Sequence, residues 1–514
     1  MFSKVSRISK KYVGCRFAQT VHPGVIDCES SEWNSALPYD SIPGPKALPL
    51  VGNTWRFLPF IGDFKIEHID KVCRQLHQTY GKIVKMEGLL GRPDMLFLFD
   101  PDLIERVFRQ EDTLPYRPSM PSLTYYKHKY KREIFGENGG VIAVHGEEWQ
   151  KFRSKVNQIM LQPSVANQYI DTINEASDQF VERIEYLKDT REEVPGDFLN
   201  EIHKWSLESL ARVALDIKLN CLVENPRQHT QELIDAVNTF FMGVPILELK
   251  NPMWRILPTP TFRSYINALD TIYELCNQHI EEAMKRASLP GEKCSVLQRV
   301  LKNHDSKIAK NLALDLFLVG IDTTSNAVAS VLYQLAQHPD IQEKLYETLS
   351  MEGFLEESTI DLKFLKKAGY LKACIKETMR MFPVVIGNGR CTTSNSVVGG
   401  YQVPKGVQVI FQHYVISNLD EYFPRSSEFL PERWLSKDQN NTRHNFASLP
   451  FGFGKRMCLG RRFADLEMQI VIAKVIKNYK VSYNYPSLDY HIHPMFTPNG
   501  PLRFKFERRI PKTD

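Results

Sequence analysis

The sequence predicts a mainly α-helical protein with small β-sheets (α+β), folded as a single unit. Three observations favour this class. Apolar residues recur at the helical period through most of residues 145–350. Short β-rich segments with Gly and Pro turns occur near residues 83–99 and 399–411, and again after residue 478. Hydrophobic residues make up 43% of the 514 residues and charged residues 24%, which is typical of a globular protein and excludes a disordered or fibrous one.

Charge and cysteine content narrow the function further. The net charge of +5 comes from 65 basic and 60 acidic side chains, a balance that does not indicate nucleic-acid binding. Nine cysteines, without a CxxC pair, argue against a disulfide framework or a structural zinc site and indicate a reducing compartment. No run of 18 apolar residues occurs, so we do not expect a transmembrane helix.

The first 26 residues are basic, contain serines and lack acidic side chains. On a helical wheel the apolar residues lie on one side, and opposite them lie the basic residues Lys4, Arg7, Lys10 and Lys11. Such a start is typical of a mitochondrial presequence; the alternative is a basic tail without a targeting function. We therefore expect a presequence and linker over residues 1–35 and one folded catalytic domain over residues 36–514.

Individual elements follow from the hydrophobic period and from Pro and Gly breaks. After a stiff, Pro-rich connector at 41–53, we expect helices and strands at 64–80, 83–86, 95–99 and 101–109. Later in the chain we expect two long helices that end before Pro339 and Pro383, then a strand and a C-terminal helix, at 311–337, 361–381, 407–411 and 461–478.

The strongest chemical signal is the segment 451–460, Phe-Gly-Phe-Gly-Lys-Arg-Met-Cys-Leu-Gly. Glycines on both sides of Cys458 let a flat ligand approach the backbone closely. The N-terminus of the helix that follows and the nearby cations favour a lowered thiol pKa, and a thiolate is a strong donor to iron. The alternative is an inert cysteine in a Gly-rich turn, but the pattern is expected by chance only on the order of 10⁻⁴ times in such a chain.

This segment resembles the haem-binding loop of the cytochrome P-450 family of haem-thiolate monooxygenases, and the resemblance extends over residues 40–508. It implies the triangular, prism-like P-450 fold, with haem b buried between the long central helix and the helix after the cysteine loop. It also implies that Cys458 is the axial ligand of the haem iron, that Arg456 contacts a haem propionate and that Phe451 lies against the haem.

A second motif consists of Glu377 and Arg380, three residues apart on one helix, followed by Arg433 in a Pro-Glu-Arg-Trp segment. On its own an E-x-x-R pair is weak, because most such pairs are solvated ion pairs on a helix surface. The family resemblance implies that Glu377, Arg380 and Arg433 form a buried structural triad that supports haem loading.

A third motif, Val-Gly-Ile-Asp-Thr-Thr at 319–324, interrupts the predicted helix 311–337 with poor helix formers. Such a local conflict often marks a functional site, although a Thr-rich surface turn is the alternative. The resemblance implies that Gly320 makes room for dioxygen. It also implies that Thr323 hydrogen-bonds the dioxygen or a proton-delivering water, and that Asp322 feeds this relay.

Further positions match propionate contacts of the family. Trp149 and Arg153, four residues apart, share a helix face, a spacing that is weak alone. The resemblance implies that both reach the haem propionates, and that Arg390, seven residues after Pro383, is another such contact.

The redox partner is implied by two basic pairs. Lys372 and Lys376 precede Glu377, and Arg461 and Arg462 follow the cysteine loop. Both pairs resemble mitochondrial members of the family, which take electrons from an adrenodoxin-type [2Fe–2S] ferredoxin and its reductase; the alternative is an ordinary solvated basic face. NADPH would act only indirectly, since no Gly-rich dinucleotide loop occurs. We therefore expect the matrix side of the inner mitochondrial membrane, with peripheral membrane association.

The implied function is oxidation of a small hydrophobic substrate by dioxygen. By resemblance, the substrate pocket comes from residues 135–144, 239–249, 314–323, 383–389 and 494–499, which are mainly apolar. Residues 118–128 resemble arthropod mitochondrial members, a group that includes ecdysteroid hydroxylases and xenobiotic-metabolising enzymes. The alternatives are a haem-thiolate isomerase or dehydratase, a non-catalytic haem- or lipid-binding module, and the same chemistry on the endoplasmic reticulum.

Overall fold

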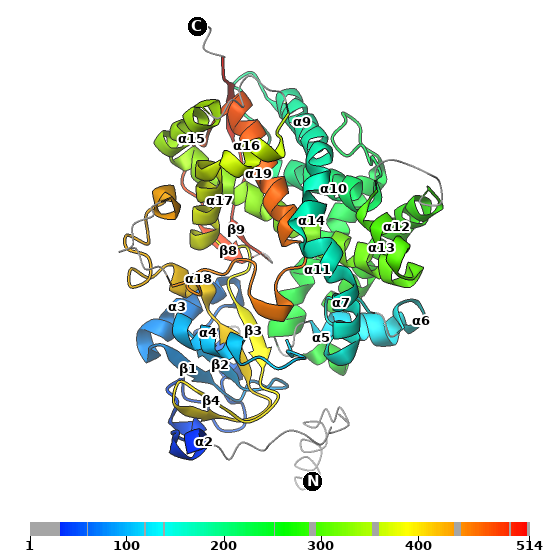
Figure 1. The fold of residues 1–514 in the computed structure, drawn as a ribbon. Coiled ribbons are helices and arrows are strands. Elements are labelled where there is room, and N and C mark those ends of the chain that lie inside the picture. The colour runs from blue at the N-terminus through cyan, green and yellow to red at the C-terminus, as the bar shows by residue number, and fades with distance from the viewer. Residues whose placement is uncertain are drawn as a thin grey trace.

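The computed structural model describes residues 31–510 apart from 59, 118–119, 137–138, 251, 287–293, 352–358, 436–443 and 493–494. The basic segment of residues 1–26 therefore lies outside the described residues, and of the predicted presequence and linker only residues 31–35 are described. Helices form most of the molecule, and the four-stranded sheet of residues 83–86, 95–98, 388–391 and 408–411 lies to one side of them, at the lower left of Figure 1. This arrangement confirms the predicted fold class.

The helices of the first half are α2 Ser31–Ser35, α3 Ile69–Tyr80, α4 Pro101–Arg109, α5 Pro121–Tyr125, α6 Arg132–Phe135, α7 Gly146–Leu161, α8 Pro163–Ala166, α9 Ile170–Leu187, α10 Phe198–Leu215 and α11 Gln228–Leu249. Those of the second half are α12 Pro260–Arg286, α13 Val296–Asn303, α14 Ser306–Gln337, α15 Pro339–Met351, α16 Leu362–Lys367, α17 Gly369–Met381, α18 His413–Ser417 and α19 Arg461–Asn478. Three short turns carry Lys127, Arg433 and Arg456: the π-helical turn η4 Tyr126–Tyr130 and the 3₁₀ turns η7 Pro431–Trp434 and η8 Gly454–Arg456.

The largest sheet has the strand order β1-β2-β6-β3, with bounds Ile83–Met86, Met95–Leu98, Gln408–Phe411 and Asn388–Cys391. Strands β2 and β6 are parallel, and the other neighbours are antiparallel. The remaining strands form antiparallel pairs: β4 Ser396–Val398 with β5 Tyr401–Val403, β7 Tyr479–Ser482 with β10 Lys505–Arg508, and β8 Tyr490–Ile492 with β9 Phe496–Pro498.

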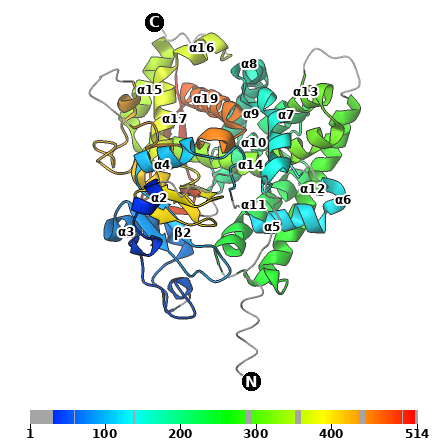
Figure 2. The ribbon, with the colours of Figure 1, turned by 60° about the horizontal axis from the view of Figure 1, so that its bottom comes forward.

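Helix α14 runs through the middle of the helical part (Figures 1 and 2). It begins where the Asp305 side chain accepts a hydrogen bond from the Ile308 amide, five residues earlier than the sequence predicted. It is the one helix among the described residues long and apolar enough to cross a membrane, but 78% of its most apolar window is buried inside the protein. We therefore treat α14 as a core helix.

Most predicted elements are present in the structure, but the helix predicted at 64–80 begins only at Ile69, as α3, and another predicted helix is divided in two. The predicted strand 83–86 and the helices 101–109 and 461–478 coincide with β1, α4 and α19. The predicted helix 361–381 is wrong as a single element, because it is divided into α16 and α17. Ala368 leaves the helical region, with φ −62° and ψ 61°, and Gly369 starts the second helix.

The N-terminal part of the described chain is attached to the small sheets. The Leu37 amide donates to the Gly400 oxygen (2.9 Å), and the Gln402 amide donates to the Leu37 oxygen (2.8 Å). The Gln402 side chain also donates to the Trp33 oxygen (2.8 Å). Residues 31–35, which the sequence assigned to the presequence and linker, therefore contact the β4–β5 hairpin.

Candidate active site around Cys458

The cysteine loop folds back on itself just before α19. The Cys458 amide donates to the Phe451 oxygen (2.9 Å), and the Met457 amide donates to the Gly454 oxygen (3.1 Å). Gly452 and Gly454 have φ of +69° and +74°, a region that side chains disfavour. A Cβ on Gly452 would lie 2.9 Å from Asn388 Nδ2, so the loop also needs glycine for space.

The thiol of Cys458 faces an internal space. By accessible surface the residue is exposed, yet burial is the largest cause that raises the pKa of its thiol. Exposed surface on a thiol that protein surrounds on most sides is what an internal space beside the thiol would produce. The Gly460 backbone hydrogen bond and the charges of Arg153 and Arg117 lower this pKa in opposition to burial. The predicted net lowering of the thiol pKa is therefore wrong for the chain alone, because desolvation outweighs the helix N-terminus and the cations.

Four guanidinium groups from distant parts of the chain converge beside this loop. Arg153 NH2 donates to the Met457 oxygen (2.8 Å). Arg456 donates to the Pro115 and Val144 oxygens at 3.1 and 3.0 Å, and its guanidinium lies 3.6 Å from the ring centre of Trp149. Arg390 pairs with Glu111, and Arg117 completes the group.

The cluster carries more positive charge than Glu111 balances, and the pKa values of its guanidiniums reflect this excess. Burial, together with the mutual repulsion of the cations, lowers the pKa of Arg117 and Arg153 to about 10 and that of Arg456 to about 9. Burial also lowers the pKa of Arg390, against the opposing charge of Glu111. Three buried donor nitrogens, Arg153 Nε, Arg390 NH2 and Arg456 NH2, have no hydrogen-bond partner among the described residues. The cluster is therefore suited to bind an anionic group.

Helix α14 is open along one face. Between Ile308 and Ala336 its side chains are buried except for Lys310 near the start and for the partly exposed stripe Leu316, Val319, Gly320 and Thr323. These four positions follow the i, i+3, i+4, i+7 spacing of one helix face. Gly320 and Thr323, two of the three residues predicted to act on dioxygen or its protons, thus lie on this partly exposed face of α14.

Comparisons with known proteins decide the family. The family model described as cytochrome P-450 matches residues 42–499. The chain belongs to the cytochrome P-450 family. It is 46% identical to the probable cytochrome P-450 49a1 of Drosophila melanogaster, over 93% of this chain and 84% of that protein. It is 47% identical to the probable mitochondrial cytochrome P-450 301a1 of the same species, over 93% and 89% of the two chains. A third relative, the probable mitochondrial cytochrome P-450 12a5, is 34% identical over 92% of each chain.

The family makes this P-450 a monooxygenase with haem iron as its cofactor. The described residues fit that group. The thiol of Cys458 is exposed and can serve as an iron ligand. The two glycines with positive φ have no side chain that would keep a flat ligand away from the loop. The unpartnered arginine nitrogens can bind the two haem propionates. Phe451 lies in the same loop, with its ring 5.6 Å from the Arg461 guanidinium.

The carboxylate of Asp322 in α14 contacts a histidine of the neighbouring helix α10. Asp322 Oδ1 lies 3.1 Å from His203 Nε2 of α10, and both residues are buried. Its other oxygen, Oδ2, has no partner among the described residues. Thr323 donates to the Val319 oxygen one turn earlier (2.8 Å), which leaves the hydroxyl oxygen able to accept a further hydrogen bond.

The structure brings Glu377, Arg380 and Arg433 together. Arg380 donates to both carboxylate oxygens of Glu377, at 2.9 and 2.8 Å, and Arg433 Nε donates to Oε1 at 2.8 Å. The carboxylate also accepts from the Trp434 ring nitrogen (2.8 Å) and the Leu430 amide (3.1 Å). Glu377 and Arg380 have no exposed side-chain surface. The triad is therefore a fully bonded buried network.

The basic pairs also gather on one face. Lys376 is exposed and lies near Trp434, while burial and the charge of Lys376 lower the pKa of Lys372. Burial raises the pKa of Asp465, and the charges of Arg461, Arg462 and Lys376 oppose that rise. The charges of Arg461, Arg462 and Lys376 all act on Asp465, so these three cations lie close together where α19 begins beside α17.

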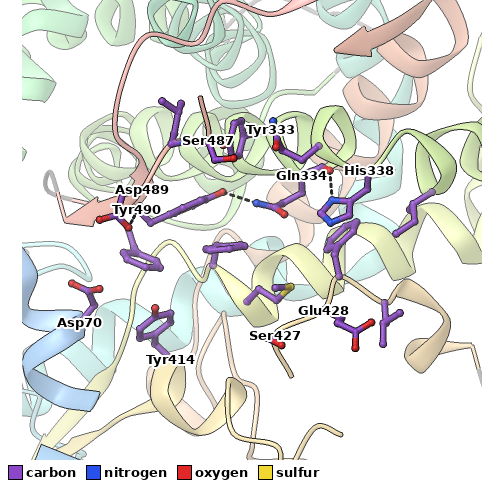
Figure 3. Close-up of a pocket in the computed structure, with 18 of the residues that line it drawn as sticks. Asp70, Tyr333, Gln334, His338, Tyr414, Ser427, Glu428, Ser487, Asp489 and Tyr490 are labelled. Carbon is purple, nitrogen blue, oxygen red and sulfur yellow. Dashed lines mark hydrogen bonds between the residues drawn. The ribbon is translucent and has the colours of Figure 1, made fainter. Parts of the chain in front are cut away.

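A separate hollow of about 910 Å³ lies elsewhere in the molecule (Figure 3). Asp70 and Tyr414 line one side of it, and Tyr333 and Gln334 of α14, with His338 just after that helix, line another. Its lining includes neither the cysteine loop nor the arginine cluster. The haem site is therefore located by the Cys458 thiol and the arginine cluster, and not by this hollow.

Sequence reasoning missed three residues of the site: Arg117, Glu111 and His203. Arg117 lies between Pro115 and Pro118, and this Pro-flanked cation was the only local signal. No local sequence pattern marks Glu111 or His203, because their partners, Arg390 and Asp322, are more than 100 positions away in the sequence.

Proposed function

We propose that this P-450 is a mitochondrial monooxygenase that hydroxylates or otherwise oxidises a small hydrophobic substrate with electrons from an adrenodoxin-type ferredoxin. The observation that carries the proposal is the Cys458 thiol, open to an enclosed space and flanked by four converging guanidiniums. The domain limits we propose are a presequence and linker at 1–35 and a catalytic domain at 36–514.

Each part of the cysteine site has a proposed role. Cys458 would hold the haem iron, whose positive charge favours the thiolate. Arg153, Arg390 and Arg456 would bind the propionates through their unpartnered nitrogens, with Trp149 supporting Arg456. Haem supplies the activation of dioxygen, by which one oxygen atom enters the substrate and the other leaves as water. Glu377, Arg380 and Arg433 would keep the underlying scaffold rigid.

Proton delivery is the proposed task of Asp322 and Thr323. The Oδ2 atom of Asp322 has no partner among the described residues and is available to a water. The Thr323 hydroxyl can accept a hydrogen bond from a water while it donates its own proton to the Val319 oxygen. Gly320, on the same helix face, would make room for dioxygen, since a Cβ there would lie 3.3 Å from Leu210 Cδ2 and narrow the space further. Without this relay, protons would arrive at the wrong place and reduced oxygen would leave as peroxide.

Thr323→Ala tests the relay. We expect haem binding to persist and the fraction of electrons recovered as hydrogen peroxide to rise several-fold, by about tenfold at most. Thr324→Ala is the matched control, because Thr324 is adjacent but buried away from the open stripe. Equal peroxide yields from the two variants would refute the assignment.

Ferredoxin docking is proposed for the basic surface of Lys372, Lys376, Arg461 and Arg462. Cations on one face steer an acidic partner, and salt screens the attraction. Lys372→Glu and Lys376→Glu together should slow reduction by adrenodoxin at low salt and leave substrate affinity unchanged. Lys405→Glu with Lys480→Glu is the control, since both lysines are exposed elsewhere. An unchanged reduction rate at low salt would contradict the docking site.

The mitochondrial matrix side of the inner membrane is the proposed location, supported by relatives whose names include the word mitochondrial. Peripheral attachment is supported by exposed apolar side chains in two neighbouring segments. Phe60 and Ile61 are in the first, and Ile256 and Leu257 are in the second. The turn at Arg92 joins them: Arg92 donates to the Lys250 oxygen (2.9 Å), and the Leu90 amide donates to the hydroxyl of Thr54 (2.8 Å).

Vesicle flotation tests this attachment. Ile256→Asp with Leu257→Asp should release the protein from vesicles of phosphatidylcholine and cardiolipin. Met351→Asp, which changes an 85% exposed side chain on α15, is the control. Equal flotation of both variants would show that this patch does not bind the membrane.

The substrate class follows from the apolar pocket segments. Val385 is 52% exposed next to buried Val384, and the Phe496 amide ties β9 to the Val384 oxygen (3.0 Å). Apolar surface of this kind suits a steroid-like compound, such as an ecdysteroid, or a hydrophobic xenobiotic. Titration of the ferric enzyme with both classes, followed by haem absorption, separates them: a tight shift with ecdysteroids alone indicates a steroid substrate, and shifts with many xenobiotics alone indicate detoxification.

A further inference from the structure

A buried ion pair joins η4 to α14 beside the proposed active site. Lys127 Nζ lies 2.6 Å from Asp315 Oδ1, and the two side chains are only 3% and 4% exposed. They are 188 positions apart in the sequence. A charge pair this deeply buried is costly unless further hydrogen bonds satisfy both groups.

Those hydrogen bonds come from one loop. Lys127 Nζ also donates to the Gly139 oxygen (2.6 Å) and the Ile142 oxygen (3.2 Å). Asp315 Oδ2 accepts from the amides of Val141 (2.6 Å) and Ile142 (3.2 Å). The backbone of residues 139–142 therefore encloses the ion pair, and every proton of the ammonium group has an acceptor.

Gly140 makes this arrangement possible. Its φ is +89°, and a Cβ at this position would lie 2.2 Å from Asp315 Oδ2. Neither the backbone conformation nor the space allows another residue without a shift of the loop. The chain thus keeps a glycine where the loop approaches the carboxylate most closely.

The loop is also fixed at both ends. The Gly139 amide donates to Glu148 of α7 (2.8 Å), and the Thr124 hydroxyl donates to the Ala143 oxygen (2.9 Å). The Val144 oxygen accepts from Arg456 of the cysteine loop (3.0 Å). Asp315 itself directly precedes the open stripe of α14 that begins at Leu316. The loop therefore spans from that stripe to the proposed haem-binding arginines.

We propose that Lys127 and Asp315 are positioning residues that hold residues 139–144 as a rigid wall of the substrate space and thereby set which ligand shapes fit. The inference rests on the proposed function in so far as this loop borders the active site. An apolar contact would let the loop slide, whereas an ion pair with four backbone partners has a single arrangement. Partly exposed Val141 and Ile142 are the side chains that this clamp of Lys127 and Asp315 holds in place.

Hydrogen exchange tests the clamp without any turnover. In Asp315→Asn and Lys127→Met, the amides of residues 139–144 should exchange at least about tenfold faster, because each variant removes a buried hydrogen-bond partner. Lys310→Met is the matched control: Lys310 also lies on α14 and pairs with Glu281, but both side chains are partly exposed. Unchanged exchange of the loop in the clamp variants, or equal changes in the control, would overturn the proposal.

Ligand selectivity is the second measurement, made on the haem-loaded enzyme with imidazole and 4-phenylimidazole as probes. The ratio of their dissociation constants should change by about tenfold in the clamp variants, while the value for imidazole stays constant. Faster loop exchange with an unchanged ratio would show a purely structural clamp and refute the selectivity role. Failure of the proposed function is distinguishable, because the unmodified protein would then show no haem absorption with either probe.

Gly140→Ala covers the case in which removal of a charge prevents folding. It leaves both charges in place and moves the loop away from Asp315. We expect the same faster exchange and the same change in the probe ratio. A folded Gly140→Ala protein with unmodified exchange and ratio would contradict the proposal.

Discussion

The buried carboxylate of Glu377 offers the sharpest test of how the scaffold is held. Glu377→Gln keeps the shape of the side chain but removes the charge that Arg380 and Arg433 share. Breaking a buried pair in this way costs about 3–5 kcal/mol, because it leaves an uncompensated buried charge. An unfolding entropy of about 2.1 cal/mol/K per residue amounts to about 1 kcal/mol/K for a chain of this length, so the unfolding midpoint should fall by about 3–5 °C.

The assay is thermal unfolding of the haem-loaded protein at one fixed scan rate. Glu428→Gln is the matched control, because Glu428 and Arg425 also form an i,i+3 pair, with side chains 48% and 65% exposed. An exposed pair contributes at most about 1 kcal/mol, so its midpoint should move by no more than about 1 °C. Equal shifts of the unfolding midpoint in the two variants would refute the reasoning that burial makes the triad's contribution to stability large.

Three further predictions concern loop geometry, pH and the arginine cluster. Gly452→Ala should destabilise the protein by about 1–2 kcal/mol in urea unfolding, because its φ is +69° and its Cβ would meet Asn388. Gly460→Ala, whose Cβ would meet no atom of the described residues within 4 Å, should not, and an equal loss of stability in the two variants would argue against this account. Burial raises the pKa of Glu467 from 4.5 to about 7, so the folded chain binds more protons than the unfolded chain between these values and stability falls as pH rises through that window. Glu467→Gln should remove this loss of about 3 kcal/mol, and an unchanged slope of stability against pH would contradict it. Arg117→Met should stabilise the apoprotein, since it relieves repulsion, yet speed haem loss by about tenfold, because the cluster loses one positive charge that attracts the propionates. Unchanged or slower haem loss would show that the charge of Arg117 does not help to hold the cofactor.

The sequence predicted those features that local signals determine. Helix α4 begins at Pro101 with its Asp100 cap, and α19 follows Gly460, so both ranges agree with the structure. The cysteine motif is likewise a local signal, since all its residues lie within 451–460. The break between α16 and α17 was missed because the hydrophobic period continues across Ala368.

Features that depend on tertiary contacts could not be predicted in this way. Arg117, Arg153, Arg390 and Arg456 come from four separate segments, and only the fold shows that they repel one another. Likewise the pairing of His203 with Asp322 joins two helices that no local pattern connects. The direction of the Cys458 pKa was wrong because desolvation depends on how the whole chain encloses the thiol.

The central claim is that Cys458 binds the haem iron. X-ray absorption at the iron edge of the purified ferric protein tests it most directly, in comparison with Cys458→His. We predict one sulfur neighbour of iron in the unmodified protein and none in the variant, which should still bind haem through nitrogen. A spectrum of the unmodified protein with only nitrogen and oxygen neighbours, or a sulfur neighbour that persists in Cys458→His, would contradict the assignment.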